Sequence, residues 1–259
     1  MSIFGAFLMQ NSVKLSKGLP IVQTLEAYHL DVLVEQNCLG AKKCDVFEGE
    51  NLNYFFVGRP AYKFAPTETQ SQLWEYPCCF IFDFSDDTSF KRIFPFDSGA
   101  FAAKMYPPYI QMMKLESFDV AEVPDASRKI IGAFFANSYE YCRGKPKSGL
   151  EFAKEYPKET SAEVSALQLL YNETGITIVD DRRFTVEVQI GQEVEFGSKA
   201  PVAVVVPMDY LENNAFMERA QQDWGAKIIS YPIYSLNRDN VYGQIYERVY
   251  AFYQLSGYL

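Results

Sequence analysis

The sequence predicts an α+β or mixed α/β fold, with strands toward both ends of the chain and helices between them. Three patterns lead to this prediction. Tyr76–Phe84 is a run of aromatic and apolar residues, as in a buried strand. Ala126–Cys142 places apolar side chains at helical intervals. From Ile176 onward, apolar and polar residues alternate with the period of a strand.

The other elements follow from the same patterns and from capping residues. The further strands we expect are Thr24–Leu30, Tyr54–Val57, Arg92–Phe96, Ile176–Val179, Phe184–Ile190, Glu193–Phe196, Lys227–Tyr231 and the continuously apolar, hence central, Val202–Val206. The further helices we expect are Asp31–Asn37 with Asp31 as its N-cap, Asp97–Lys104, Leu150–Asn172 with a break at Pro157, Asn213–Trp224 and Val241–Tyr253. Met1–Pro20 is expected to be a loosely structured lead-in.

Composition sets limits on the class of protein. The chain has 259 residues, of which 48% are hydrophobic and 16% aromatic, enough for a sizeable core. We expect a single domain over residues 1–259, with Gly144–Gly149 as a loop break within it. The net charge of −9 disfavours a broad nucleic-acid-binding face and tilts the expectation toward protein or small-molecule substrates.

Cysteine usage and the N-terminus bear on compartment and metals. The five cysteines are odd in number, show no CxxC spacing and include the adjacent pair Cys78 and Cys79 in an apolar run, which indicates buried thiols. With one histidine in the chain, a zinc site is disfavoured and no metal is expected. The apolar stretch Met1–Gln10 is too short for a signal peptide or a membrane span. We therefore expect a cytoplasmic protein without membrane association.

The segment Asn53–Tyr62, NYFFVGRPAY, carries the first candidate site residue. Arg59 follows the end of an aromatic strand and precedes Pro60, which restricts the backbone and therefore the directions that the guanidinium can take. Because arginine matches phosphate or carboxylate in bidentate fashion, an anion at the strand end is one hypothesis. The alternative, favoured on this segment alone, is a surface arginine in a Gly-Pro turn.

Two later segments carry polar residues in unusual places. Glu187 lies in mid-strand within Phe184–Ile190 and shares a face with Gln189. Acidic residues are depleted in strands, so a partly buried one has a partner or a task, unless it faces solvent on a one-sided sheet. Asp97 and Ser98 precede an expected helix, where they serve either as an ordinary N-cap or as part of a phosphate-binding turn.

His29, Arg59 and Glu187 stand in an order and context that resemble the DNA ADP-ribosyltransferase toxins of bacterial toxin–antitoxin systems, the DarT-like family. There, a histidine on the first strand precedes a short helix, as in YHLDVLVEQNCL. An arginine follows an aromatic strand in the form F-x-x-R-x-P, which FFVGRPAY approximates. A glutamate lies on a late strand, as in RRFTVEVQI. The resemblance covers Thr24–Phe84 and, more loosely, Arg182–Val206.

This resemblance implies an ADP-ribosyltransferase-like fold, with two small mixed or antiparallel sheets forming an NAD cleft and helices around them. The implied activity is an NAD-consuming ADP-ribosyltransferase or NAD glycohydrolase of toxin or antiviral-defence type. NAD would be its co-substrate, and DNA, RNA or protein its acceptor. An antitoxin or regulatory protein is an implied partner. Two alternatives stay open: a non-enzymatic nucleotide- or protein-binding module on the same fold, and an RNA 2′-phosphotransferase-like enzyme, which would need more basic residues.

The resemblance also implies a role for each motif residue. His29 would donate hydrogen bonds to the nicotinamide ribose, and Arg59 would pair with the NAD pyrophosphate or the substrate. Tyr54 or Tyr62 would stack on the nicotinamide ring. Glu187 would be the catalytic residue, stabilising the positive charge that develops on the ribose or activating the acceptor as a base.

These roles predict that the motif histidine, arginine and glutamate converge on one cleft. The backbone of Asp97 and Ser98 is expected to line the same cleft and to contribute to cofactor binding. Glu193 and Glu195 are the fallback candidates for the catalytic carboxylate, because an error of a few residues in strand register would bring either into the same position.

Overall fold

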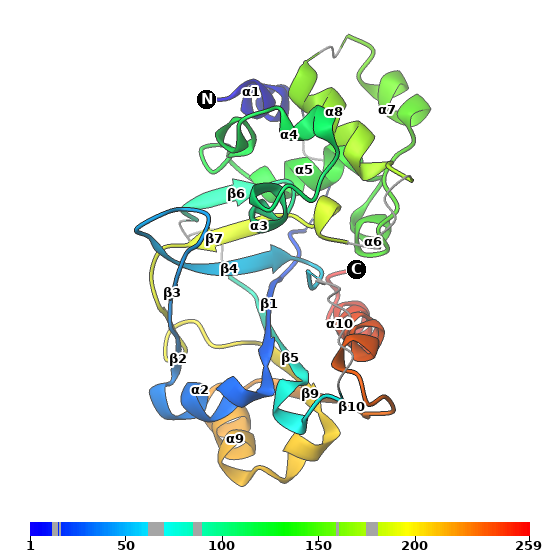
Figure 1. Ribbon diagram of the computed structural model, residues 1–259. Helices are drawn as coiled ribbons and strands as arrows, with labels where there is room; N and C mark the ends of the chain where they lie inside the picture. The colour runs from blue at the N-terminus through cyan, green and yellow to red at the C-terminus, as the bar shows by residue number, and fades with distance from the viewer. Residues whose placement is uncertain (12–14, 16, 62–69, 85–89, 159–160, 175–180) are drawn as a thin grey trace.

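The structure is a computed structural model that describes residues 1–11, 15, 17–61, 70–84, 90–158, 161–174 and 181–259 (Figure 1). Its strands are β1 (Ile21–Glu26), β2 (Cys38–Leu39), β3 (Lys42–Lys43), β4 (Asn51–Val57), β5 (Pro77–Phe82), β6 (Arg92–Phe94), β7 (Glu187–Ile190), β8 (Val194–Glu195), β9 (Ala203–Pro207) and β10 (Lys227–Tyr231). Its α-helices are α1 (Ile3–Gln10), α2 (Leu30–Gln36), α3 (Ser98–Ala102), α4 (Pro108–Gln111), α5 (Ala126–Phe134), α6 (Ser138–Cys142), α7 (Gly149–Glu155), α8 (Ala162–Tyr171), α9 (Asn214–Glu218) and α10 (Tyr242–Leu255).

The predicted α+β class is confirmed, with one main mixed sheet and one small sheet rather than two small sheets. The eight-stranded main sheet has the order β10-β9-β5-β1-β4-β7-β6, and β3 pairs with β4. Strands β9 and β10 run parallel, and the other neighbours in this order are antiparallel. The small sheet consists of β2 and β8. Strand β9 is paired on both sides and fully buried, as its continuous apolar sequence predicts.

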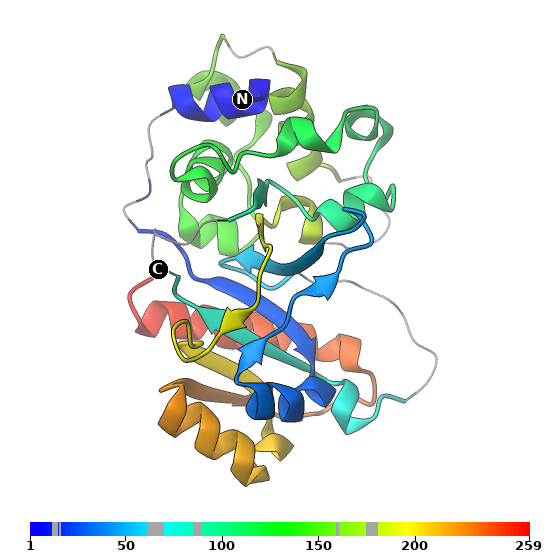
Figure 2. The same cartoon turned by 90° about the vertical axis from the view of Figure 1, so that its left-hand side faces the viewer.

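Helices cover the sheet at both ends and on its faces. Figures 1 and 2 show α1, α4, α5, α7 and α8 gathered beyond β6 and β7, with α2 and α9 at the opposite end of the molecule. Helix α10 covers the face of the sheet that carries Val22, Cys79 and Val205, and contributes Ile245 and Val249 to that apolar cluster. A larger cluster joins the opposite face to helices at both ends of the molecule. None of the described helices is long and apolar enough to cross a membrane.

Several elements differ from the sequence-based expectation. The lead-in contains helix α1, because Phe4 and Phe7 pack against aromatic rings from distant parts of the chain, including Phe134. The predicted helix Ala126–Cys142 is divided into α5 and α6, since the chain is extended at Phe135 and α6 has its own N-cap. The predicted strand Ile176–Val179 lies outside the described residues.

The first strand also lies earlier than predicted. Strand β1 begins at Ile21 and ends at Glu26, because its whole length pairs with β5. His29 therefore belongs to a 3₁₀ turn, Ala27–His29, and not to a strand. The helix that follows begins at Leu30, with His29 rather than the predicted aspartate at the N-cap position.

Candidate functional site

The end of β4 is a tight turn that only glycine fits. Gly58 has φ +69°, and an added Cβ would lie 2.5 Å from the Leu19 side chain. Its N–H donates to the Pro20 carbonyl at 2.7 Å, which fixes the chain against the start of β1. The turn directs Arg59 away from the sheet toward α6 and α10.

The Arg59 side chain is enclosed by aromatic rings and is only 4% exposed. Its guanidinium carbon lies 4.7 Å from the ring centroid of Phe184 and 5.3 Å from that of Tyr246. Nη1 donates to the Tyr141 carbonyl at 3.2 Å. Because a guanidinium keeps its charge in proteins, the two rings and the carbonyl stabilise a permanent cation at this position. The surface arginine of the alternative interpretation is thus not what the structure has.

A pocket of about 270 Å³ opens beside this cation, between the end of β4, α6 and α10. Its lining residues are Gly58, Arg59, Pro60, Tyr139, Cys142, Arg143, Tyr246, Glu247, Val249 and Tyr250. The rings of Tyr139 and Tyr250 meet edge to face at 5.7 Å. Arg143 adds a second guanidinium, 5.1 Å from the Tyr139 ring and 41% exposed. The pocket therefore combines planar aromatic walls with two arginines and one acidic residue.

The pocket also contains a thiol, which is not suited to nucleophilic chemistry. Burial raises the pKa of the Cys142 thiol to about 12, although the positive charge of Arg59 opposes the shift. A thiol in this state is protonated at neutral pH, and the thiolate is the reactive form. Cys142 thus lines the pocket without serving as a nucleophile.

Glu187 belongs to a second group of polar side chains, on strand β7 beside β4. In the register of the sheet it lies opposite Phe56 on β4 and Phe94 on β6. Gln189 lies in the next row, opposite Tyr54 and Arg92. Glu187 is 1% exposed, which rules out the solvent-facing glutamate of the one-sided sheet.

The Glu187 carboxyl is held by three hydrogen bonds. The Ser98 N–H donates to Oε2 at 3.0 Å, and the Ser98 hydroxyl donates to Oε1 at 2.7 Å. Gln189 Nε2 donates to Oε1, also at 2.7 Å. Burial, followed by the nearby charge of Asp97, raises the pKa of Glu187 to about 8 in spite of these bonds. The carboxyl is therefore mainly protonated at neutral pH.

Neighbouring side chains continue this group toward the surface. Arg92 donates to Gln189 Oε1 at 3.3 Å and makes two 2.8 Å bonds to the carboxylate of Glu50. Hydrogen bonds from Arg92 and Lys91 lower the pKa of Glu50 to about 2. The Tyr54 hydroxyl lies 2.7 Å from the sulfur of Cys44, so the group reaches this side chain as well.

The structure does not bring the three motif residues together. Strands β1 and β4 are antiparallel, with Ile21 opposite Val57, so β1 runs away from the Arg59 end of the sheet. His29 lies beyond the far end of β1, which is about 17 Å of strand from Ile21. Figure 1 shows α2, which follows His29, at that opposite end. The predicted convergence is therefore wrong for His29.

The remaining sequence candidates are distributed as follows. Asp97 is the N-cap of α3 and accepts from the Ala100 N–H at 2.7 Å, as predicted for a capping residue. Ser98 is completely buried, and its N–H is bonded to Glu187 rather than presented to a phosphate. Glu193 and Glu195 lie at and beside β8, outside the Glu187 group. Tyr62 lies outside the described residues.

The aromatic residues of the pocket were not identified from the sequence. Tyr139, Tyr246 and Tyr250 come from two helices that are far from Arg59 in the chain, and the sequence contains 18 tyrosines. The i, i+4 spacing of Tyr246 and Tyr250 on α10 was an available signal, since it places both rings on one helix face. Gln189 shared the predicted face of Glu187, but its role as a hydrogen-bond donor depends on side-chain geometry.

Comparison with known proteins adds no assignment. No family model matches the sequence, and no curated protein or solved structure matches it significantly.

Proposed function

We propose that this protein binds a nucleotide-type ligand, a planar ring that carries phosphate, in the pocket at the end of β4. The observation that carries the proposal is the Arg59 guanidinium, packed between two aromatic rings at the wall of a pocket with further tyrosines. A base can stack on tyrosine rings, while the guanidinium groups supply the positive charge and the donors that a phosphate requires.

The size of the pocket limits what it can enclose. At about 270 Å³ it is slightly smaller than the 300 Å³ or so at which pockets for whole small molecules begin. It therefore suits one ring and an adjoining phosphate, with the rest of a dinucleotide outside. NAD is the first candidate ligand, because the resemblance to ADP-ribosyltransferases implies it. ADP and AMP test whether the nicotinamide half is needed.

The test is a binding titration of the full chain with NAD, ADP and AMP. Arg143→Ala should weaken binding by about five- to tenfold, because one partly exposed phosphate contact is lost. Arg59→Lys should weaken it further, because an ammonium cannot reproduce the bidentate fork. Arg219→Ala is the matched control: its side chain has a similar exposure of 34% and a similar ion pair within a helical turn, away from the pocket. Equal affinity in all three variants would refute the proposal.

A second candidate function is NAD consumption, by ADP-ribosyl transfer or by hydrolysis. It is favoured by Glu187, a carboxyl with a perturbed pKa on the late strand to which the resemblance assigns the catalytic glutamate. In the present conformation this carboxyl is sealed and mainly neutral, whereas stabilising a cationic ribose requires the carboxylate. Catalysis would therefore require α3 to move away from β7, exposing and ionising Glu187.

Nicotinamide release from labelled NAD, with and without cell lysate as a source of acceptors, tests this second function. Turnover that disappears in Glu187→Gln while NAD binding remains would establish catalysis. Binding without turnover by the parent protein would leave the binding module as the function.

A further inference from the structure

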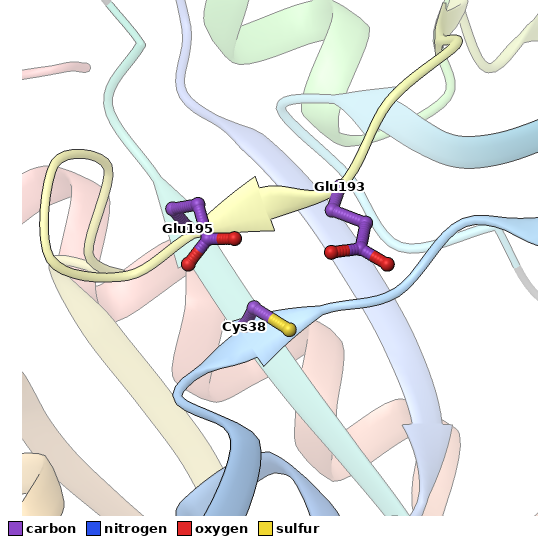
Figure 3. Close-up of side chains that lie close together, drawn as sticks. All are labelled: Cys38, Glu193 and Glu195. Atoms are coloured by element: carbon purple, nitrogen blue, oxygen red, sulfur yellow. The ribbon is translucent and has the colours of Figure 1, made fainter.

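Three side chains with metal-binding atoms converge on the small sheet, in a cluster that shares no residue with the Arg59 pocket or the Glu187 group. Cys38 of β2 lies opposite Glu195 of β8, and Glu193 is two residues before Glu195, which gives it the same side of the ribbon. The sulfur and one oxygen of each carboxylate all lie within 4.8 Å of one another. Figure 3 shows Cys38 on one strand beside Glu193 and Glu195 on the facing segment.

Two exposed glutamates alone would not indicate a ligand, and the informative residue is Cys38. It is only 8% exposed, and no hydrogen bond to its sulfur occurs among the described residues. The glutamates likewise have no ion pair in the described parts of the chain, although 24 lysines and arginines are available in the sequence. A buried thiol thus faces two uncompensated carboxylates, an arrangement that a bound cation would stabilise.

The local backbone is well fixed around this position. The buried side chain of Asn53 donates to the carbonyls of Leu39 and Gln192, at 3.1 Å in each case. It therefore ties together the two segments that carry the ligand atoms. The Phe196 N–H donates to the Asn37 carbonyl on the other side of the pair, at 3.0 Å. The ribbon itself contains only two residue pairs, so a bridging ion would add substantially to its cohesion.

We propose that Cys38, Glu193 and Glu195 bind a divalent transition-metal ion of the Zn²⁺ type, which clips β2 to β8. One thiolate and two carboxylates supply three of the four ligands of a tetrahedral Zn²⁺ site, and water completes it. A thiolate ligand selects Zn²⁺ or Co²⁺ over Mg²⁺ and Ca²⁺, which prefer oxygen alone.

The geometry is close to that of a metal site before the ion binds. Bonds of about 2.0–2.3 Å at tetrahedral angles place neighbouring ligand atoms about 3.5 Å apart. The present separations are within 4.8 Å, so the exposed glutamates need to close each separation by at most about 1.3 Å. The sequence expectation of no zinc site rested on histidine count and CxxC spacing, and a site that joins one cysteine to two glutamates of another strand escapes both criteria.

The experiment is a titration of the full, untagged chain, freed of metal, with Co²⁺ and with Zn²⁺. We expect one ion per chain, a thiolate-to-cobalt charge-transfer absorption, and a rise in the melting temperature with Zn²⁺ because the ion binds only the folded state. Cys38→Ser should lose the absorption band and the thermal shift. The double variant Glu193→Gln/Glu195→Gln should weaken metal binding at least about tenfold. A tenfold loss of affinity is the lower end of the range for residues that only hydrogen-bond to metal ligands, and these two residues are ligands themselves.

Two controls keep the result interpretable. Cys142→Ser removes a different partly accessible thiol, and Glu212→Gln removes an exposed carboxylate elsewhere, so both should bind the ion as the parent does. Absence of the cobalt band in the parent would overturn the proposal. So would persistence of the band in Cys38→Ser, or its loss in Cys142→Ser.

Discussion

Arg59 follows the end of β4 and Glu187 lies on the neighbouring strand β7, yet their charges are accommodated in opposite ways. Arg59 is packed under two rings but remains part of the wall of a pocket. Glu187 is sealed beneath α3 with a full set of hydrogen bonds. The difference follows from their chemistry: a guanidinium cannot lose its charge, whereas a carboxyl can be buried by taking up a proton. The end of β4 therefore adjoins a pocket, while Glu187 at the start of β7 is part of the core.

The largest expected effect is a pH dependence of the protein's stability that arises from Glu187. Its pKa is raised from 4.5 in the unfolded chain to about 8 in the fold, so the unfolded state releases this proton first. The contribution of Glu187 to stability is fully present below pH 4.5, falls between pH 4.5 and pH 8, and then levels off. At 1.36 kcal/mol per unit the loss amounts to at most about 4–5 kcal/mol.

Comparison with Glu187→Gln isolates this effect, because glutamine does not titrate. Urea denaturation of both proteins across this pH range should show the parent losing stability relative to the variant as pH rises. Acidic residues that lie away from Glu187 titrate equally in both and cancel in the difference. A constant difference across the range would mean that Glu187 is ionised in the folded protein, and the contrast with Arg59 would disappear.

The next effect tests the packing at the Arg59 end. Gly144 has φ +64°, and an added Cβ would lie 2.8 Å from the Phe184 ring and 3.0 Å from Arg59 Nη1. Gly144→Ala should therefore destabilise the protein by about 2–3 kcal/mol and weaken nucleotide binding. Gly225→Ala is the matched control, since Gly225 has the same φ of +64° but no atom within 4 Å of the added Cβ. It should show the backbone penalty alone, about 1 kcal/mol, with unchanged binding.

Thermal and urea unfolding give the two stabilities, and the NAD or ADP titration gives the affinities. Equal losses in both variants would show that the ring and guanidinium move aside easily. The side chains of the pocket wall would then be more mobile than the packing of Arg59 indicates.

The secondary structure shows which elements could be predicted from the sequence. Lys227–Tyr231 was predicted to the residue and Val202–Val206 to within one, because continuous apolar runs bounded by turns define strands locally. The position of β1 was predicted wrongly, because its start is set by pairing with β5 and no local pattern contains that information. Helix α1 was missed for a similar reason, since its apolar face is stabilised by rings from distant segments.

For the candidate sites, the residue types were informative and their assembly was not. An arginine between a strand end and a proline, and a glutamate in mid-strand, both stood out and both proved to be buried. Apart from Gln189, their partners lie far away in the chain, Tyr141 by 82 and Ser98 by 89 positions, and no periodicity predicts such contacts. The predicted cleft failed at His29 because an antiparallel β1 carries its two ends to opposite sides of the molecule.

The smallest expected effect concerns Ser98, which separates a helix-cap role from a ligand-binding role. Ser98→Ala removes the hydroxyl that donates to Glu187 at 2.7 Å and accepts from Gln189 at 3.2 Å, but it keeps the N–H bond and the Asp97 cap. We expect a loss of about 1–2 kcal/mol at neutral pH, as for one buried hydrogen-bonding group, and no change in nucleotide affinity. Ser148→Ala, which removes an exposed N-cap hydroxyl from α7, provides a control with a cost of about 1 kcal/mol and no connection to Glu187. The discriminating measurement is the pH dependence of the loss. Because the hydroxyl is the donor that stabilises an ionised Glu187, the loss for Ser98→Ala should grow as pH rises through about 8, whereas that for Ser148→Ala should stay constant. A fall in nucleotide affinity in Ser98→Ala would instead connect the buried group to the pocket and support the catalytic role of Glu187.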